Sequence, residues 1–275
     1  MVSRVWEGTP TVRLCRLRAL LDSEGSLAAA CASSLPDLAF TPAGQQSGVS
    51  FHGGQWIDLA IPGVEQVGGY SLVSDPSLAG GSGFDIAVKR ARHPPAAWIH
   101  SAGAKPGALV AVRVGGSFVL PTGYARLVML AGGVGINPLF CMLLELAAGS
   151  GAATGSAGGG AAAASTLQSV DLLYCARTRE ELLFQEQLQG LAGGALEGRL
   201  RVRYVVTREA AGAAAPSREA RAALACGLVG GNAATGGAGP TGVLICGPPS
   251  FSEDMIRAVE GAGVASCNIH CEKWW

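Results

Sequence analysis

The second half of the chain alternates continuous apolar runs with helical segments, and this alternation constrains the fold more than any other feature. The runs occupy 127–131, 170–175, 202–206 and 243–246. Each has the length of a strand and is mainly apolar, with Asp171 and Arg203 as the charged residues among them, as strands of a parallel sheet between helices are. The sequence after Tyr124 therefore predicts an α/β fold with a parallel sheet.

The first half shows a different period. Phe84, Ile86 and Val88 alternate with other residue types, and Val110 to Val114 do the same before a Gly-Gly turn. Period two with frequent Gly, Pro and Ser turns predicts half-buried antiparallel strands in a small barrel or sandwich. A weak helical pattern covers 15–21.

Composition narrows the function classes. Lys plus Arg and Asp plus Glu number 20 each, which argues against a nucleic-acid partner. The eight cysteines form no C-x-x-C pair, so we expect no metal site. Many of the 41 glycines fall in two low-complexity stretches, 147–166 and 210–239. We interpret these as insertions, with a helix over 217–228 inside the second.

One stretch imitates a membrane span, because 127–144 carries no charged residue. Three glycines and Asn137-Pro138 interrupt it, which predicts strand, turn and helix instead. No apolar segment of a signal peptide opens the chain, and no presequence is recognisable in it. We therefore expect a soluble protein with no membrane span and an unknown oligomeric state.

A glycine-rich loop joins the first parallel strand to the next helix. It contains Gly132, Gly133, Val134, Gly135, Ile136 and Asn137. Glycines at such a junction let backbone N–H groups approach a diphosphate at a helix N-terminus, and Asn137 is the expected N-cap. Pro138 replaces the third glycine of the G-x-G-x-x-G pattern, so the dehydrogenase fingerprint is absent. A tight turn without a ligand is the alternative.

A second junction has the same order of elements. Cys246 ends an apolar strand, and Gly247, Pro248 and Pro249 follow it. Both junctions then lie at the carboxyl edge of the sheet, where open α/β sheets bind ligands. The Cys246 thiol would face that crevice; a structural buried cysteine is the alternative.

Five motifs in order give the chain a family resemblance. They are Phe51–Trp56 with the sequence FHGGQW, Gly69-Tyr70-Ser71, the Gly132 loop, CGPP from Cys246, and the ending EKWW. Their order and spacing resemble the ferredoxin–NADP reductase-like flavoproteins over nearly the whole chain. The resemblance implies a Greek-key, flavin-binding β-barrel over 1–123 and a Rossmann-like NAD(P)-binding domain over 124–275.

The resemblance also implies roles for particular residues. Tyr70 would pack on the flavin ring, Ser71 would hydrogen-bond near flavin N5, and Cys246 would lie beside the nicotinamide. Glu272 is a possible proton partner, and Trp274 or Trp275 would cover the flavin. The implied catalytic residues are thus Ser71, Cys246 and Glu272. The remaining implied cofactor-binding residues are Lys89, Trp98, Arg177, Gly247, Pro248 and the Gly132–Asn137 loop.

Two positions depart from the family pattern. Gly68 stands where relatives carry an arginine for the flavin diphosphate, and Ala96 stands near an expected serine. Losing such a charge-assisted contact costs about 1.5–3 kcal/mol. Lys89, Arg90 and Arg92 are close enough in sequence to substitute, although a solvated basic patch is the alternative. FAD is therefore less secure than NAD(H) or NADP(H).

The expected function is a flavin-dependent oxidoreductase. It would pass a hydride from NAD(P)H to FAD and electrons on to an unidentified acceptor, in the mitochondrion by resemblance. Arg177 and Arg179 suit the 2′-phosphate of NADPH, but the expectation leans toward NADH. The alternative is a catalytically weak or inactive nucleotide sensor on a reductase scaffold.

Overall fold

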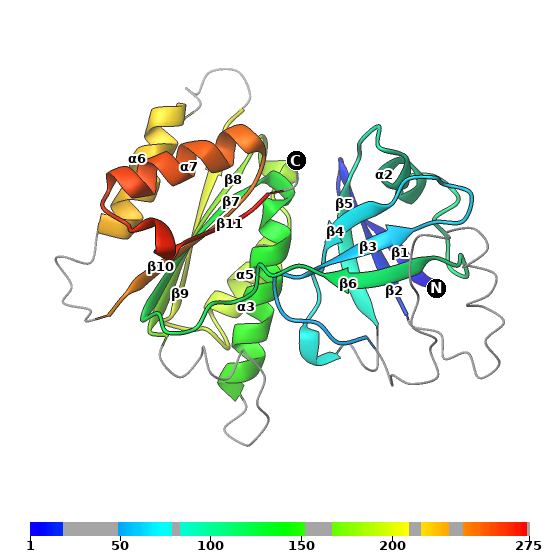
Figure 1. Ribbon diagram of the computed structural model, residues 1–275, viewed down its shortest axis with the longest axis horizontal. Helices are drawn as coiled ribbons and strands as arrows, with labels where there is room; N and C mark the ends of the chain where they lie inside the picture. The colour runs from blue at the N-terminus through cyan, green and yellow to red at the C-terminus, as the bar shows by residue number, and fades with distance from the viewer. Residues whose placement is uncertain (19–48, 79–82, 152–166, 209–215, 231–238, 274–275) are drawn as a thin grey trace.

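The structure is a computed structural model that describes residues 1–18, 49–78, 83–151, 167–208, 216–230 and 239–273. It has a half built of antiparallel strands and a half built on a parallel sheet, as the two sequence periods predict (Figure 1). Most of the two predicted insertions, including 152–166 and 231–238, lies outside the described residues.

The parallel sheet has five strands in the order β11-β10-β7-β8-β9. Its strands are β7 (Arg126–Gly132), β8 (Ser169–Ala176), β9 (Leu200–Val206), β10 (Thr241–Cys246) and β11 (Ile269–Glu272). All neighbouring strands pair in parallel. The four predicted apolar runs are therefore confirmed as strands, and a fifth, short strand joins at the edge.

Helices cover both faces of this sheet, which explains why its central strands are apolar on both sides (Figure 1). One face packs against α3 (Ile136–Gly151) and α5 (Gln185–Ala192), and the other against α6 (Arg218–Gly230) and α7 (Pro249–Gly261). The predicted helix over 217–228 is confirmed as α6. The predicted insertion at 147 begins inside α3, which continues to Gly151.

The antiparallel half consists of two three-stranded sheets with the orders β1-β2-β5 and β4-β3-β6. Their strands are β1 (Val2–Thr9), β2 (Val12–Leu17), β3 (Trp56–Ala60), β4 (Gly68–Ser71), β5 (Phe84–Lys89) and β6 (Ala111–Gly115). A bridge between Leu72 and Ile86 connects the two sheets into a barrel-like unit. Its one described α-helix is α2 (Pro94–Ile99). The weak helical pattern at 15–21 was wrong for 15–17, which belong to β2; most of the rest lies outside the described residues.

Strand β5 departs from the predicted half-buried pattern, because five of its six residues are buried. Phe84, Ile86 and Val88 face the core of the barrel-like half. Ala87 packs in the cluster that also contains residues of α3. Helix α3 thus lies between the parallel sheet and the barrel-like half, and β5 is covered on both sides (Figure 1).

Helix α3 also makes polar contacts with the barrel-like half. The Glu145 carboxylate accepts a hydrogen bond of 2.9 Å from the Gly53 N–H, and Cys141 Sγ donates to the Ser74 carbonyl at 3.2 Å. Burial raises the pKa of the Cys141 thiol to about 12, so the thiol stays protonated at neutral pH. The FHGGQW motif is therefore the surface on which α3 docks.

None of the described helices has the length and apolar character needed to cross a membrane.

Candidate active site

The two predicted junctions lie side by side at the carboxyl edge of the parallel sheet. Ala131 of β7 pairs with Cys246 of β10, so the loops that follow these strands are neighbours. A Cβ atom at Gly135 would overlap the Cys246 carbonyl oxygen, and one at Gly247 would lie 2.5 Å from the Phe251 ring. These glycines are therefore required by backbone packing between the loops, whether or not a ligand is present.

One glycine of the loop is open. Gly133 has a φ of 57°, and a Cβ placed on it would have no atom within 4 Å. Gly133 and Val134 are partly exposed, whereas Gly132, Gly135 and Ile136 are buried. The accessible part of the predicted dinucleotide loop is thus Gly133 and Val134. They are the first two residues of the short 3₁₀ turn Gly133–Gly135, which lies immediately before α3.

Asn137 has a different role from the predicted N-cap. It is the second residue of α3, and its side chain donates a 2.8 Å hydrogen bond to the Ala87 carbonyl of β5. The prediction of an N-cap was therefore wrong, because the amide reaches across to the barrel-like half. Its Oδ1 atom is buried and has no hydrogen-bond partner among the described residues. A buried acceptor without a donor is costly, and a ligand N–H can satisfy it.

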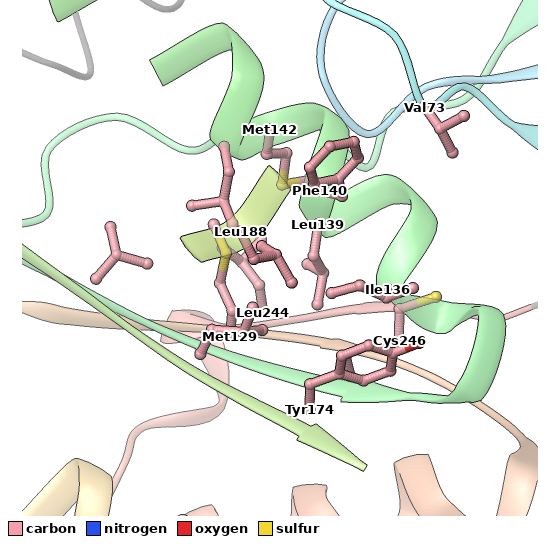
Figure 2. Close-up of a cluster of buried hydrophobic side chains, with 14 of the residues drawn as sticks. Val73, Met129, Ile136, Leu139, Phe140, Met142, Tyr174, Leu188, Leu244 and Cys246 are labelled. Carbon is pink, nitrogen blue, oxygen red and sulfur yellow. The ribbon is translucent and has the colours of Figure 1, made fainter. Parts of the chain in front are cut away.

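Cys246 ends β10 as predicted, but its thiol does not face an open crevice. The residue is 1% exposed and belongs to the hydrophobic cluster between the sheet and α3. Figure 2 shows Cys246 beside Ile136 at the start of α3 and near Tyr174 of β8. The structure therefore shows the alternative of a buried cysteine, because α3 begins directly above the end of β10.

Glu272 is the neighbour of Cys246 on the next strand. The residue is half-buried at the end of β11, and burial raises the pKa of its carboxyl group above the ordinary value. A carboxyl group with a raised pKa at the carboxyl edge suits proton transfer. Trp274 and Trp275, which follow it, lie outside the described residues.

The backbones of Arg177 and Arg208 are in contact where β8 and β9 end. The Arg208 N–H donates a 2.6 Å hydrogen bond to the Arg177 carbonyl, so the two residues are adjacent at the same edge as Gly133. Both residues are exposed. Sequence reasoning selected Arg177 and missed Arg208, because the pairing of β8 with β9 brings together positions that are distant in the chain.

Lys89 makes an ion pair across the two halves. Its Nζ lies 3.5 Å from Glu181 Oε2, and Thr11 Oγ1 donates to Glu181 Oε1 at 3.4 Å. Glu181 precedes α5 in the parallel half, while Lys89 and Thr11 belong to the barrel-like half. This charge is therefore already compensated by a carboxylate of the parallel half.

Tyr70 and Ser71 occupy β4 of the barrel-like half. Ser71 is buried, and the Tyr70 ring lies against Gly68, where an added Cβ would come within 2.5 Å of Tyr70 Cε2. The Tyr70 hydroxyl is buried without a hydrogen-bond partner among the described residues, and burial raises its pKa. A larger residue at position 68 would therefore collide with the Tyr70 ring.

The remaining predicted residues divide between core and surface. Trp98 of α2 packs in the barrel-like core, and its Nε1 would lie 2.7 Å from a Cβ at Gly103. Ala96 is buried in the same helix, whereas Pro248 is exposed beside the second junction. Among the described residues, no three His, Cys, Asp or Glu side chains come together as metal ligands.

Phe251 is a further residue that the sequence did not indicate. It lies in the first turn of α7, and Cβ atoms added at Gly132 and Gly247 would come within 2.9 Å and 2.5 Å of its ring. Helix α7 begins at Pro249 with Pro248 as N-cap and no side-chain cap. Phe251 therefore packs against both glycine junctions where they lie side by side.

Comparisons with known proteins agree with this arrangement. Residues 129–258 match the oxidoreductase NAD-binding domain family. The chain is 35% identical over 232 residues to oxidoreductase NAD-binding domain-containing protein 1 of Xenopus laevis, covering 82% of this chain and 71% of that protein.

Solved structures show the same fold at low sequence identity. The CS-b5R domains of human Ncb5or in the NAD+ form have a TM-score of 0.71 at 20% identity, covering 99% of this chain and 68% of that chain. A ferredoxin NADP+ reductase from Neisseria gonorrhoeae with bound FAD and NADP has a TM-score of 0.64 at 18% identity, covering 100% and 97%.

Proposed function

Since the chain belongs to the ferredoxin–NADP reductase-like family of oxidoreductases, we propose that it uses NAD(P)H to reduce a flavin and that the electrons then pass to a further acceptor. We take residues 1–123 as the flavin-binding domain and 124–275 as the NAD(P)-binding domain. A flavin supplies an N5 atom that accepts a hydride from a nicotinamide. The chain's own residues would bind and orient the two reactants and supply a proton.

The observation that carries this proposal is the contact between the glycine loop and the barrel-like half. Asn137, at the end of the loop, donates to the Ala87 carbonyl of β5 at 2.8 Å. In the barrel-like half, Tyr70 and Ser71 lie at the end of β4. This strand is connected to β5 through the Leu72–Ile86 bridge. A dinucleotide on the loop and a flavin on β4 would therefore meet at one seam.

Two buried groups without hydrogen-bond partners in the described part of the chain, one in each half, support the binding of ligands. Asn137 Oδ1 is a buried acceptor and the Tyr70 hydroxyl is a buried donor, and neither has a hydrogen-bond partner among the described residues. Ring N–H and carbonyl groups of a flavin or a nicotinamide carboxamide are chemically suited to satisfy them. The raised pKa of Glu272 suits a proton partner at the same edge.

We further infer a preference for NADPH over NADH. Arg177 and Arg208 are adjacent and exposed at the edge where β8 and β9 end. We propose that both guanidinium groups reach the doubly charged 2′-phosphate, which only NADPH carries, from these neighbouring backbone positions. The sequence alone favoured NADH, because it does not reveal that Arg208 lies beside Arg177.

Steady-state kinetics with the two dinucleotides tests the preference. Arg177→Ala and Arg208→Ala should each raise KM for NADPH by about tenfold or more and leave KM for NADH nearly unchanged. Arg203→Ala is the matched control, because Arg203 is an exposed arginine within β9. Equal losses with both dinucleotides would count against 2′-phosphate recognition.

The alternative is a nucleotide-binding sensor without turnover. Gly68, which brings no charge to the flavin side, favours it, whereas Tyr70 and Ser71 favour the reductase. Isothermal calorimetry separates the two functions. The reductase requires that the protein bind both a dinucleotide and a flavin and oxidise NAD(P)H with an artificial acceptor. Dinucleotide binding without flavin binding would support the sensor.

A further inference from the structure

The contact between Gly68 and Tyr70 closes the space in which a side chain at position 68 would stand. A Cβ at Gly68 would lie 2.5 Å from Tyr70 Cε2, 2.7 Å from the Tyr70 hydroxyl oxygen and 2.8 Å from Pro95 Cβ. Gly68 is buried, and Pro95 belongs to α2. Position 68 therefore brings no charge to the neighbourhood of Tyr70.

Helix α2, which touches this contact, begins with two prolines. Pro94 and Pro95 occupy its first two positions, and proline has no backbone N–H. The Ala97 N–H donates to the His93 carbonyl at 2.9 Å, and His93 makes no side-chain cap. The start of α2 is therefore poor in the N–H donors by which helix N-termini bind phosphate groups.

Three cations of the barrel-like half are already paired. Lys89 lies 3.5 Å from Glu181, Arg16 lies 2.7 Å from Asp85, and Arg13 lies 2.7 Å from Glu7. Arg90 and Arg92 are exposed residues of the loop before α2. Diphosphates are held by charge-assisted hydrogen bonds from arginine or by clustered N–H groups. The described residues around Tyr70 supply neither as a preformed site, so they do not fit the diphosphate of FAD.

We propose that this chain takes flavin as an exchangeable substrate, recognised by its ring system and not by its phosphates. This inference rests on the proposed function. Tyr70 and Ser71 offer an aromatic face and a hydroxyl to the ring, which riboflavin, FMN and FAD share. NAD(P)H gives a hydride to flavin N5 and Glu272 supplies the one proton, which it regains from solvent, so that the products are NAD(P)+ and dihydroflavin. The dihydroflavin leaves with both electrons.

Equilibrium binding of the three flavins to the full chain tests the inference. Quenching of flavin fluorescence should give dissociation constants for riboflavin, FMN and FAD within about threefold of one another. Flavin should also be lost on gel filtration. Binding of FAD that is about tenfold or more tighter than that of riboflavin would overturn the inference and leave the proposed function standing. No binding of any flavin would overturn both.

Two variants locate the effect. Pro94→Ala with Pro95→Ala restores two N–H groups at the start of α2 and keeps the Pro95 Cβ position. It should tighten binding of FMN and FAD by about tenfold relative to riboflavin. Arg90→Ala with Arg92→Ala should leave the ratio of the FAD and riboflavin constants unchanged. A loss of FAD binding alone in that variant would show that these arginines hold the phosphates and would contradict the inference.

Discussion

The glycine loop at the end of β7 and the Gly68–Tyr70 contact of β4 lie in different halves of the site and use glycine differently. In the loop, Gly135 packs against the backbone of Cys246, which cannot move without the strand. At β4, Gly68 packs against the Tyr70 side chain, which can rotate. A glycine packed against backbone keeps the conformation of its loop, because neither partner can move aside. A glycine packed under a side chain leaves no space for a larger residue unless that side chain moves.

Replacing Gly135 and Gly133 of the loop by alanine is the strongest test of this difference. Gly135→Ala should lower the free energy of unfolding by about 3 kcal/mol, because the Cβ would overlap the Cys246 carbonyl. Gly133→Ala should cost only about 1 kcal/mol, since its φ of 57° is strained for alanine but its surroundings are open. Urea unfolding measures both. Equal costs would mean that the loop is not held by backbone packing.

The β4 contact predicts coupling between two side-chain changes. Gly68→Ala should lower stability by about 1–2 kcal/mol when Tyr70 is present, because the ring must move. In a Tyr70→Ala background the same change should cost at least about 0.5 kcal/mol less. The double-mutant cycle by urea unfolding checks this. Strict additivity would show that Pro95, and not Tyr70, is what confines Gly68.

The smallest expected effect concerns Glu272. Its pKa is raised from 4.5 by burial, so the folded state holds this proton more tightly than the unfolded state. The group therefore reduces stability as the pH rises from 4.5 toward its folded-state pKa. Glu272→Gln should remove that decline and raise Tm slightly at neutral pH. Thermal unfolding between acidic and neutral pH compares the two proteins, and parallel profiles would mean that Glu272 keeps its ordinary pKa.

The sequence predicted the parallel half well. Its strands β7, β8 and β10 are almost entirely buried, and these three and β9 all coincide with mainly apolar runs of the sequence. The loop before α3 was predicted because glycines and Pro138 leave few other structures possible. Local composition was sufficient there, since the backbone itself determines the geometry.

Contacts between residues that are distant in the chain were not predictable. Asn137 was expected to cap α3 but bonds to Ala87, fifty residues earlier in the chain. Cys246 was expected to face the crevice at the sheet edge, with a buried cysteine as the alternative, and the start of α3 covers it. Arg208 and Phe251 reach the site only through strand pairing and helix packing. These positions depend on long-range packing, for which a single sequence carries no local signal.

Reduction of a flavin by NADPH under anaerobic conditions tests the central claim most directly. The full chain would be mixed with one equivalent of FMN and then with NADPH, and the visible absorbance of oxidised flavin would be followed in a stopped-flow spectrometer. We predict that the absorbance is lost with one NADPH consumed per flavin, and more slowly in Ser71→Ala. Retention of the oxidised spectrum, with NADPH binding still detected by calorimetry, would contradict the account.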